Sequence, residues 1–353
     1  MVWLLSPYVF ICICMVQARK WNNTGKGSIV LEEAWTIPEF VAQASVSVPP
    51  PGQTTAQLEA NLLDIHNQRL AAMDLHGIDF MVLSCAAPCI QGISDPNTAA
   101  TFATKVNDEL ASAIANNTMR FGGFASLSMH DPAAAAKELN RTVFEHGFLG
   151  ALLNDYQQSG PDNTTLLYYD QPEYDVFWSM AETLDVPVYL HPRFPIAQIT
   201  ALEYAHSPFI LGPVNEFQVT LSNHILGIIA NGVFDRFPRL KFIVGHLGER
   251  IPSDLVRIDE HISRQKSRGL PMLKNASDYW RSNIFETTSG NFATPLLKFH
   301  ADAIGLDRIL FSIDYPFETI SEGTNWLDTI PLSAKDKLRL AREGAIELLK
   351  LNH

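Results

Sequence analysis

The feature that most constrains the fold is an alternation of short, apolar, β-branched runs with longer segments of helical spacing. Parallel strands need long crossover connections, which are usually helices, so this alternation predicts βα units around a parallel sheet. The eight predicted strands are residues 28–34, 80–86, 121–129, 150–155, 187–192, 241–246, 283–290 and 308–316. The predicted helices are residues 58–75, 97–116, 132–146, 172–184, 249–265, 293–303 and 334–350.

Eight βα units in one chain are typical of a (β/α)8 TIM barrel. We expect this α/β barrel to occupy residues 28–353, with residues 19–27 as a linker. A doubly wound sheet is the alternative, but neither G-x-G-x-x-G after the first strand nor a G-x-x-x-x-G-K-[ST] phosphate loop is present. Residues 42–56 and 194–232 exceed what a minimal barrel needs, and we expect both on the face where barrel active sites form.

The N-terminal segment suggests a destination for the protein. Residues 1–18 carry no charge and are mostly apolar, and Val16-Gln17-Ala18 is a small-residue cleavage pattern. The apolar run is too short for a membrane span but suits a secretory signal peptide, which predicts a secreted or extracellular protein that is not membrane-embedded. A basic segment ahead of the apolar run is missing, so a mistaken start codon and a cytoplasmic protein are the alternative.

Glycosylation sequons and cysteines bear on the same question. Five Asn-X-Ser/Thr sequons, at residues 22, 116, 140, 163 and 275, are compatible with secretion. Cleavage after residue 18 leaves only Cys85 and Cys89. Their C-x3-C spacing suits a small disulfide loop and equally a pair of loop thiols, and two cysteines do not make a zinc site.

The charge balance restricts the partners. The 353 residues include 26 Lys and Arg against 38 Asp and Glu, a formal net charge of −12. Most of the surface would repel a polyanion, so we expect no nucleic-acid partner. An anionic small molecule remains compatible, because a bound cation can reverse the local field.

Ionisable residues stand at the carboxyl ends of four predicted strands. The first strand ends in Glu32-Glu33, the fifth in His191 and the sixth in His246, and the eighth carries Asp314. In a barrel these ends converge on one mouth, and carboxylates with imidazoles suit a divalent ion such as Zn²⁺ or Mn²⁺. Any one of them could be a packed histidine or a capping carboxylate, but together they predict a metal site.

Other polar residues are open to two readings. Asn154, at the end of the fourth strand, is either a substrate contact or part of an Asx turn. His224 stands out because it lies in the additional segment 194–232. We expect most of the other histidines, at residues 66, 76, 130, 146, 206, 261 and 300, at the surface.

Several strings resemble the amidohydrolase-superfamily decarboxylases of aromatic acids. They run in order from residue 28 towards the C-terminus: VLEEAW, FGGFASLSMHDP, LNDYQ, VPVYLHPRFP, NGVFDRFPRLKFIVGHLGE and DRILFSIDYPFE. The group includes 2,3-dihydroxybenzoate, γ-resorcylate and 6-methylsalicylate decarboxylases and is related to aminocarboxymuconate-semialdehyde decarboxylases. HPRFP, GHLGE and FSIDYPFE are specific in combination.

The resemblance implies a site and an assembly. Glu32, His191 and Asp314 would bind one divalent ion, Zn²⁺ or Mn²⁺ with Mg²⁺ as a further option, and no organic cofactor is implied. Many superfamily members have the second His of H-x-H where this chain has Ala34, which counts against a two-metal hydrolase. Arg257 would reach a substrate pocket, in a neighbouring subunit of a homodimer or homotetramer.

The resemblance also implies a carboxy-lyase that acts on a small aromatic carboxylic acid. The reaction would be non-oxidative decarboxylation of an ortho-hydroxybenzoic acid of the salicylate type, releasing CO₂ and a phenol. Asp314 would protonate the ring carbon, while His246, held by Glu249, would manage the hydroxyl proton. A metal-dependent hydrolase of a lactone or amide and a non-catalytic barrel are the alternatives. The expected substrate-binding residues, besides Arg257, are Asn154, Trp35, Phe194 and Phe311.

Overall fold

The computed structural model describes residues 19–352, so the predicted signal segment lies outside the described residues. Eight parallel strands run in the order expected for a barrel, with β1–β2–β3 in one sheet and β4–β7–β8–β9–β10 in another. A parallel bridge between Ala125 and Ala151 joins the sheets on one side. On the other side, the Ala34 amide donates to the Tyr315 carbonyl at 2.7 Å. The predicted (β/α)8 barrel is therefore confirmed.

The strands lie where the apolar runs predicted them, although most are shorter. The barrel strands are β1 (Ser28–Trp35), β2 (Ile78–Cys85), β3 (Phe121–Gly123), β4 (Ala151–Asn154), β7 (Val188–His191), β8 (Phe242–Val244), β9 (Ile284–Thr287) and β10 (Ile309–Leu310). A separate antiparallel hairpin, β5 (Gln157–Ser159) with β6 (Thr165–Leu167), follows β4.

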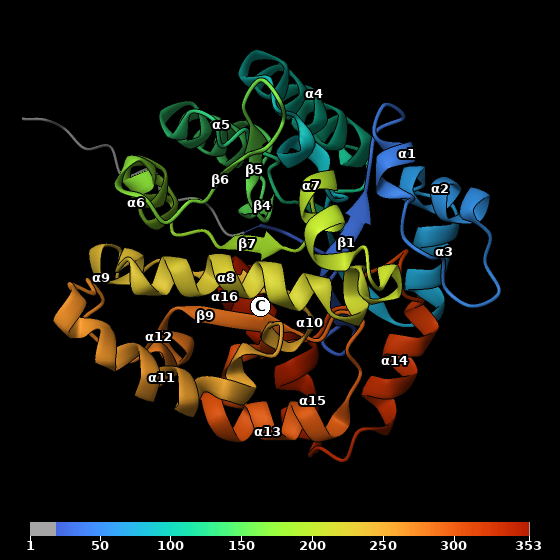
Figure 1. The fold of residues 1–353 in the computed structure, drawn as a ribbon. Coiled ribbons are helices and arrows are strands. Elements are labelled where there is room, and N and C mark those ends of the chain that lie inside the picture. The colour runs from blue at the N-terminus through green and yellow to red at the C-terminus, as the bar shows by residue number, and fades with distance from the viewer. Residues whose placement is uncertain (1–18, 353) are drawn as a thin grey trace, which may run out of the picture.

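Helices surround the strands on the outside (Figure 1). Among residues 19–352, no helix combines the length and apolar character needed to cross a bilayer. The helices are α1 (Val41–Ala44), α2 (Thr55–Leu63), α3 (Gln68–Leu75), α4 (Pro96–Ile114), α5 (Pro132–Glu145), α6 (Asp175–Leu184), α7 (Ala197–Ile199), α8 (Glu216–Ala230), α9 (Val233–Arg236), α10 (Gly245–Gly248), α11 (Leu255–Ser263), α12 (Ala276–Ser282), α13 (Thr294–Ile304), α14 (Ile320–Thr329), α15 (Ala334–Leu338) and α16 (Gly344–Leu349).

Alternation along each strand divides the core into two layers. Leu31 on β1 and Val82 on β2 belong to the cluster inside the barrel, whereas Val30 and Met81 pack outwards against the helices. This period of two follows from the strand geometry. The pairing of β1 with β2 shifts register between Val30 and Glu33. Such an irregularity redirects side chains at the strand end, beside the barrel mouth.

Two predicted helices are interrupted for local reasons. The helix predicted over 58–75 is two helices, because Asp64 accepts hydrogen bonds from the amides of Asn67 and Arg69 and starts α3 anew. The helix predicted over 249–265 begins only at Leu255, after a short 3-10 turn. Asp131 and Ser333 cap α5 and α15, since both side chains accept from first-turn amides.

The two additional segments lie beside the mouth, as expected. Arg250, which follows β8, donates to the Val214 carbonyl at 3.3 Å and so links segment 194–232 to that strand end. Ala44, at the end of α1, packs in a small cluster with Ala34 and Ala86. In Figure 1, α8 crosses in front of the strands. Both additional segments therefore flank the carboxyl ends of the strands.

Candidate active site

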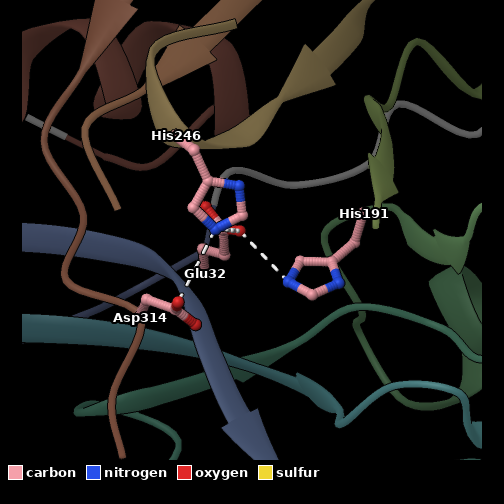
Figure 2. A group of neighbouring side chains, drawn as sticks. All are labelled: Glu32, His191, His246 and Asp314. Carbon is pink, nitrogen blue, oxygen red and sulfur yellow. Dashed lines mark ion pairs between the residues drawn. The ribbon is translucent and has the colours of Figure 1, made fainter. Parts of the chain in front are cut away.

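Four predicted residues meet at the mouth of the barrel. Glu32 comes from β1, His191 ends β7, His246 follows β8 and Asp314 follows β10 (Figure 2). Each offers one ligand atom, and these atoms lie within 4.8 Å of one another. The expectation that strand ends gather these side chains is confirmed, with His246 as close to the group as the three predicted metal ligands.

Glu32 is held so that one oxygen faces the group. Its Oε2 accepts hydrogen bonds from the Tyr189 hydroxyl and, at 2.8 Å, from the Thr287 hydroxyl. Its Oε1 is buried and has no hydrogen-bond partner among the described residues. That oxygen lies 3.3 Å from His191 Nε2 and 3.4 Å from His246 Nε2. A buried anionic oxygen facing two imidazoles fits a cation, because isolated buried charge is otherwise very unfavourable.

His191 presents one ring nitrogen to the group. Its Nδ1–H donates a hydrogen bond to the Pro192 carbonyl at 2.7 Å. This tautomer leaves the Nε2 lone pair facing Glu32. Burial lowers the pKa of His191 to about 4, although the Glu32 carboxylate acts in the opposite direction. A neutral imidazole with a fixed tautomer is the form that binds metal ions.

His246 and Glu249 lie on a single left-handed turn. His246, Leu247, Glu249 and Arg250 all have φ between 48° and 66°, as does Gly248 at 66°. Each non-glycine residue in this region costs roughly 1–2 kcal/mol, so neighbouring contacts must hold the turn. The Glu249 amide donates to the Gly245 carbonyl, which closes the turn. The geometry brings His246 Nδ1 to 2.5 Å from Glu249 Oε1, so the predicted pair is in contact.

Burial and neighbouring charges shift the pKa values of His246 and Asp314. Burial lowers the pKa of His246, but the Glu32 and Glu249 carboxylates outweigh burial and raise it well above its usual value. Burial raises the pKa of Asp314 to about 6, against the opposing effect of His246. Asp314 also has a left-handed backbone, with φ of 78°. The site therefore holds an acid whose pKa lies closer to neutrality than an ordinary aspartate.

A small cavity adjoins the four residues. Glu32, His191 and Asp314 line it, and its apolar wall includes Ala34, Ala86, Leu152 and Phe317. Asn154 also lines it and is 1% exposed, with an Oδ1 atom that has no hydrogen-bond partner among the described residues. An unpartnered amide oxygen facing a cavity suits a hydroxyl donor on a ligand.

The structure places other predicted binding residues away from this cavity. Trp35 and Phe311 lie in the outer core between the barrel and its helices, 5% and 0% exposed. They point outwards because alternate residues of a strand face opposite sides, so we withdraw Phe311 and Trp35 as substrate contacts. Phe194 is partly buried and packs edge-on against Phe217. Arg257 is exposed on α11 and makes no hydrogen bond or ion pair with another described residue.

Two histidines outside the site are buried and each contacts a carboxylate. His224 is buried on α8 and contacts Asp155 at 2.9 Å, while its other ring nitrogen accepts from the Tyr169 amide. His300, which we expected at the surface, is fully buried against Glu286. Helical spacing alone could not show that these positions face inwards.

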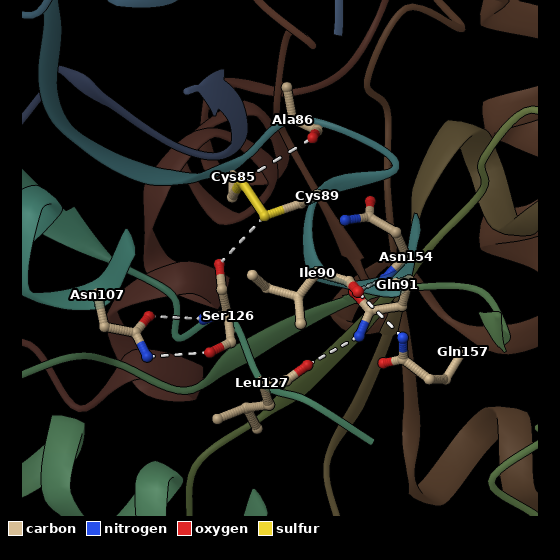
Figure 3. The surroundings of a disulfide bond; sticks show 10 residues. All are labelled: Cys85, Ala86, Cys89, Ile90, Gln91, Asn107, Ser126, Leu127, Asn154 and Gln157. Atoms are coloured by element: carbon tan, nitrogen blue, oxygen red, sulfur yellow. Dashed lines mark hydrogen bonds between the residues drawn. A yellow bond between two sulfur atoms is a disulfide. The ribbon is translucent and has the colours of Figure 1, made fainter. Parts of the chain in front are cut away.

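The loop after β2, which Figure 3 shows around its disulfide, contributes Ala86 to the cavity wall. Cys85 and Cys89 are joined by a disulfide, which resolves the choice between bridge and free thiols in favour of the bridge. Gln91, two residues further on, accepts from the Asn154 amide and donates to the Leu127 carbonyl at 2.9 Å. Arg193 donates to the Gln91 carbonyl at 2.7 Å. The disulfide-bonded loop is thereby connected to the ends of three other strands.

Some residues that support or line the site were not among those predicted from the sequence. Tyr189 precedes His191 by two residues on β7, so strand alternation could have placed it on the same face. Phe317 lies three residues after Asp314, directly after the predicted strand 308–316. Thr287 and Gln91 carried no signal, because polar side chains in strands and in the loops after them are common.

Comparisons with known proteins agree with this geometry. The family model described as amidohydrolase matches residues 40–351. A γ-resorcylate decarboxylase from Rhodococcus jostii is 42% identical over 330 residues, which cover 93% of this chain and 99% of the relative. A crystal structure of 2,6-dihydroxybenzoate decarboxylase complexed with 2,6-dihydroxybenzoate has a TM-score of 0.88 at 42% identity, covering 92% of this chain and 100% of that one.

A third relative carries a metal. The structure of a dihydroxybenzoic acid decarboxylase from Polaromonas, with bound manganese and the inhibitor 2-nitroresorcinol, has a TM-score of 0.88 at 39% identity and covers 93% of this chain and 98% of that one. Manganese, one of the two ions that the strand-end ligands suggested alongside zinc, is the metal of this neighbour. The chain therefore belongs to the amidohydrolase family and is similar, across more than nine-tenths of its length, to hydroxybenzoate decarboxylases.

Proposed function

We propose that this protein is a carboxy-lyase that decarboxylates an ortho-hydroxybenzoic acid to a phenol and CO₂. The observation that carries the proposal is the group of two carboxylates and two imidazoles beside a cavity with an apolar wall. The group can hold a cation, and the wall suits an aromatic ring. Relatives that act on γ-resorcylate and 2,6-dihydroxybenzoate match nearly the whole chain.

Glu32, His191 and Asp314 would hold one divalent ion, with His246 close enough to take part. We propose Mn²⁺, since oxygen and imidazole donors suit it and a similar structure contains it. The unpartnered Oε1 of Glu32 and the neutral Nε2 of His191 fit this assignment. When bound, the ion would supply Lewis-acid stabilisation of a phenolate oxygen.

The side chains around the ring would manage two protons. The raised pKa of Asp314 allows it to hold a proton near neutral pH and to deliver it to the ring carbon that bears the carboxylate. His246, oriented by Glu249, would take the proton of the ortho hydroxyl in its neutral form, which a bound cation favours over the imidazolium. Protonation of the ring carbon weakens its bond to the carboxylate, and loss of CO₂ restores aromaticity. Asn154 would accept a hydrogen bond from a ring hydroxyl.

A panel of benzoic acids tests the proposal directly. With Mn²⁺ present, 2,6-dihydroxybenzoate and salicylate should release CO₂ and the corresponding phenol, whereas benzoate and 3-hydroxybenzoate should be inert. The ortho hydroxyl acts in the transition state, so its removal should abolish turnover and not merely weaken binding. Equal rates with and without the ortho hydroxyl at saturating substrate would refute this chemistry.

The hydrolase alternative is disfavoured by the relatives, which are decarboxylases. A hydrolase would consume water and release no CO₂. Measuring CO₂ and phenol in equal amounts, with no ¹⁸O from labelled water in the phenol, would distinguish the two reactions.

We propose that the protein works as a homodimer or homotetramer in which Arg257 reaches a neighbouring subunit. Its side chain is exposed and makes no hydrogen bond or ion pair with another described residue, and the adjacent Val256 is 86% exposed. Leu202 and Phe209 in the additional segment are also more than 80% exposed. Light scattering after gel filtration measures the assembly, and a monomer with full activity would contradict it.

We also propose that residues 1–18 direct the chain into the secretory pathway. The sequon residues Asn116, Asn163 and Asn275 are exposed, so they are accessible to glycosylation. A disulfide between Cys85 and Cys89 is typical of an oxidising compartment. N-terminal sequencing of the mature protein should begin near Arg19, and a glycosidase should increase its gel mobility. An unglycosylated chain that begins at Met1 would contradict secretion.

A further inference from the structure

The carboxylate next to the predicted ligand Glu32 has a separate environment. Glu33 is 0% exposed, and the shift in the pairing of β1 turns it towards the segment after β10. Its Oε1 accepts from the Ser312 hydroxyl at 2.8 Å and from the Ile313 amide at 3.0 Å. Its Oε2 accepts from the Tyr315 amide at 2.9 Å. Glu33 therefore binds the backbone on both sides of Asp314.

These hydrogen bonds matter because Asp314 has an unfavourable backbone. Its φ of 78° lies in the left-handed region, which costs an aspartate free energy unless its neighbours fix it. The amides of Ile313 and Tyr315 are buried at that point, and without Glu33 both would lack these acceptors. The Ser312 hydroxyl also accepts from the Glu32 amide at 2.8 Å, so the same contacts link the strand that carries Glu32 to the segment that carries Asp314.

A buried cation interacts with Glu33, although burial raises the pKa of that carboxyl to about 8. Arg69 is 0% exposed, its guanidinium lies 4.6 Å from the centre of the Tyr315 ring, and it donates to the Ala34 carbonyl at 2.7 Å. Glu33 and Tyr315 both interact with its charge. The carboxylate, guanidinium and ring thus form a buried support on the side of β1 opposite the cavity, and none of the three serves a catalytic step described above.

We propose that Glu33 is a positioning residue, which sets the orientation of the Asp314 carboxyl for proton delivery and metal binding by holding residues 312–315. This inference rests on the proposed function, because it assumes that Asp314 delivers the proton. The displacement of a reacting group by about 1 Å can lower a rate a hundredfold, so the effect should appear in turnover rather than in substrate affinity.

The test uses the full chain and the Glu33→Gln variant, which keeps the shape but places an amide NH₂ against one of the backbone donors. With saturating Mn²⁺ and 2,6-dihydroxybenzoate as substrate, kcat should fall about 30- to 100-fold while KM changes less than threefold. Calorimetric titration with Mn²⁺ alone should show affinity lowered about three- to tenfold. Ser312→Ala removes one of the three contacts of Glu33, together with the hydroxyl that accepts from the Leu31 and Glu32 amides, and should move both quantities in the same direction.

Asp79→Asn is the matched control, since Asp79 is also a buried carboxylate on a barrel strand but contacts Arg342 at the opposite end. It should lower the melting temperature and leave kcat and Mn²⁺ affinity unchanged. If Glu33→Gln or, should that variant not fold, Ser312→Ala retains both wild-type values, the inference is wrong. If the wild type proves inactive on all the acids but the variants bind Mn²⁺ more weakly, the proposed function fails and the positioning of Asp314 stands.

Discussion

The Asp79–Arg342 pair at one end of the barrel and the polar groups at its mouth differ in how fully they are hydrogen-bonded. At the end where the strands begin, Asp79 accepts from Thr24 and Arg342, and neither Asp79 nor Arg342 has a buried side-chain atom without a partner. At the mouth, one oxygen each of Glu32, Glu249 and Asn154 is buried without a hydrogen-bond partner among the described residues. The buried polar atoms of Asp79 and Arg342 thus all have partners within the protein. Those at the mouth can find their partners only in a ligand.

Left-handed backbone gathers at the mouth, whereas Asp185 and Lys350 at the other end adopt it as single residues at helix ends. Five non-glycine residues with left-handed φ lie in the two short segments that carry His246 and Asp314. Unpartnered polar atoms and unfavourable dihedrals lower stability, so they persist where binding or catalysis needs them. In this barrel, stability is concentrated at one end and chemistry at the other, as is usual for the fold.

Among substitutions that test this difference between the two ends, the largest expected effect is on catalysis at the mouth. Asp314→Asn should lower kcat by about three orders of magnitude, because the amide cannot donate a carboxyl proton. The melting temperature should stay close to that of the wild type. Steady-state kinetics and calorimetry on the same Mn²⁺-loaded sample would check both. If the variant with metal bound keeps most of its turnover, Asp314 is not the proton donor.

The reciprocal change at the other end should affect stability alone. Asp79→Asn leaves the buried Arg342 guanidinium without its counter-charge and should lower the free energy of unfolding by about 3–5 kcal/mol. Urea unfolding would measure this loss, and kcat should not change. A clear fall in kcat in the folded variant would show that the two ends are coupled.

A smaller effect is expected at the disulfide. It lies beside the mouth, but we expect its loss to lower the stability of the fold, as the loss of Asp79 does at the opposite end. The Cys85→Ala, Cys89→Ala double variant opens a loop with a sequence separation of 4 and should lose roughly 2 kcal/mol of unfolding free energy. Wild-type protein treated with a thiol reductant should unfold like the variant. If reductant has no effect while the variant is destabilised, the loss comes from packing and not from the bridge.

The smallest effect is the pH dependence of Mn²⁺ binding, which distinguishes the roles of Asp314 and His246 at the mouth. Burial raises the pKa of Asp314 to about 6, so below pH 6 a proton competes with the ion, and affinity should fall about tenfold for each pH unit. Above pH 6, affinity should level off if His246 only assists catalysis. A continued rise would show that His246, whose pKa is raised, must lose its proton to bind the ion.

Sequence patterns predicted the barrel and the meeting of Glu32, His191, His246 and Asp314, because strand ends converge wherever eight βα units close. They could not predict which neighbour faces the mouth when a strand is irregular. Glu32 and Glu33 look alike in the sequence, and only the shifted pairing of β1 separates their roles. Phe311 was misplaced for a related reason, since it follows a very short β10 and faces the helices.

The described chain ends meet at the face opposite the mouth. Arg19 forms a parallel bridge with Leu351, and the Trp21 indole donates to the Asn352 carbonyl at 2.5 Å. A short linker could therefore join residue 352 to residue 19, and the chain could be opened at an exposed loop such as 160–164. Such a circular permutant would keep every strand beside its present neighbours. The arrangement of the strands, and with it the site, therefore does not depend on which βα unit comes first in the chain.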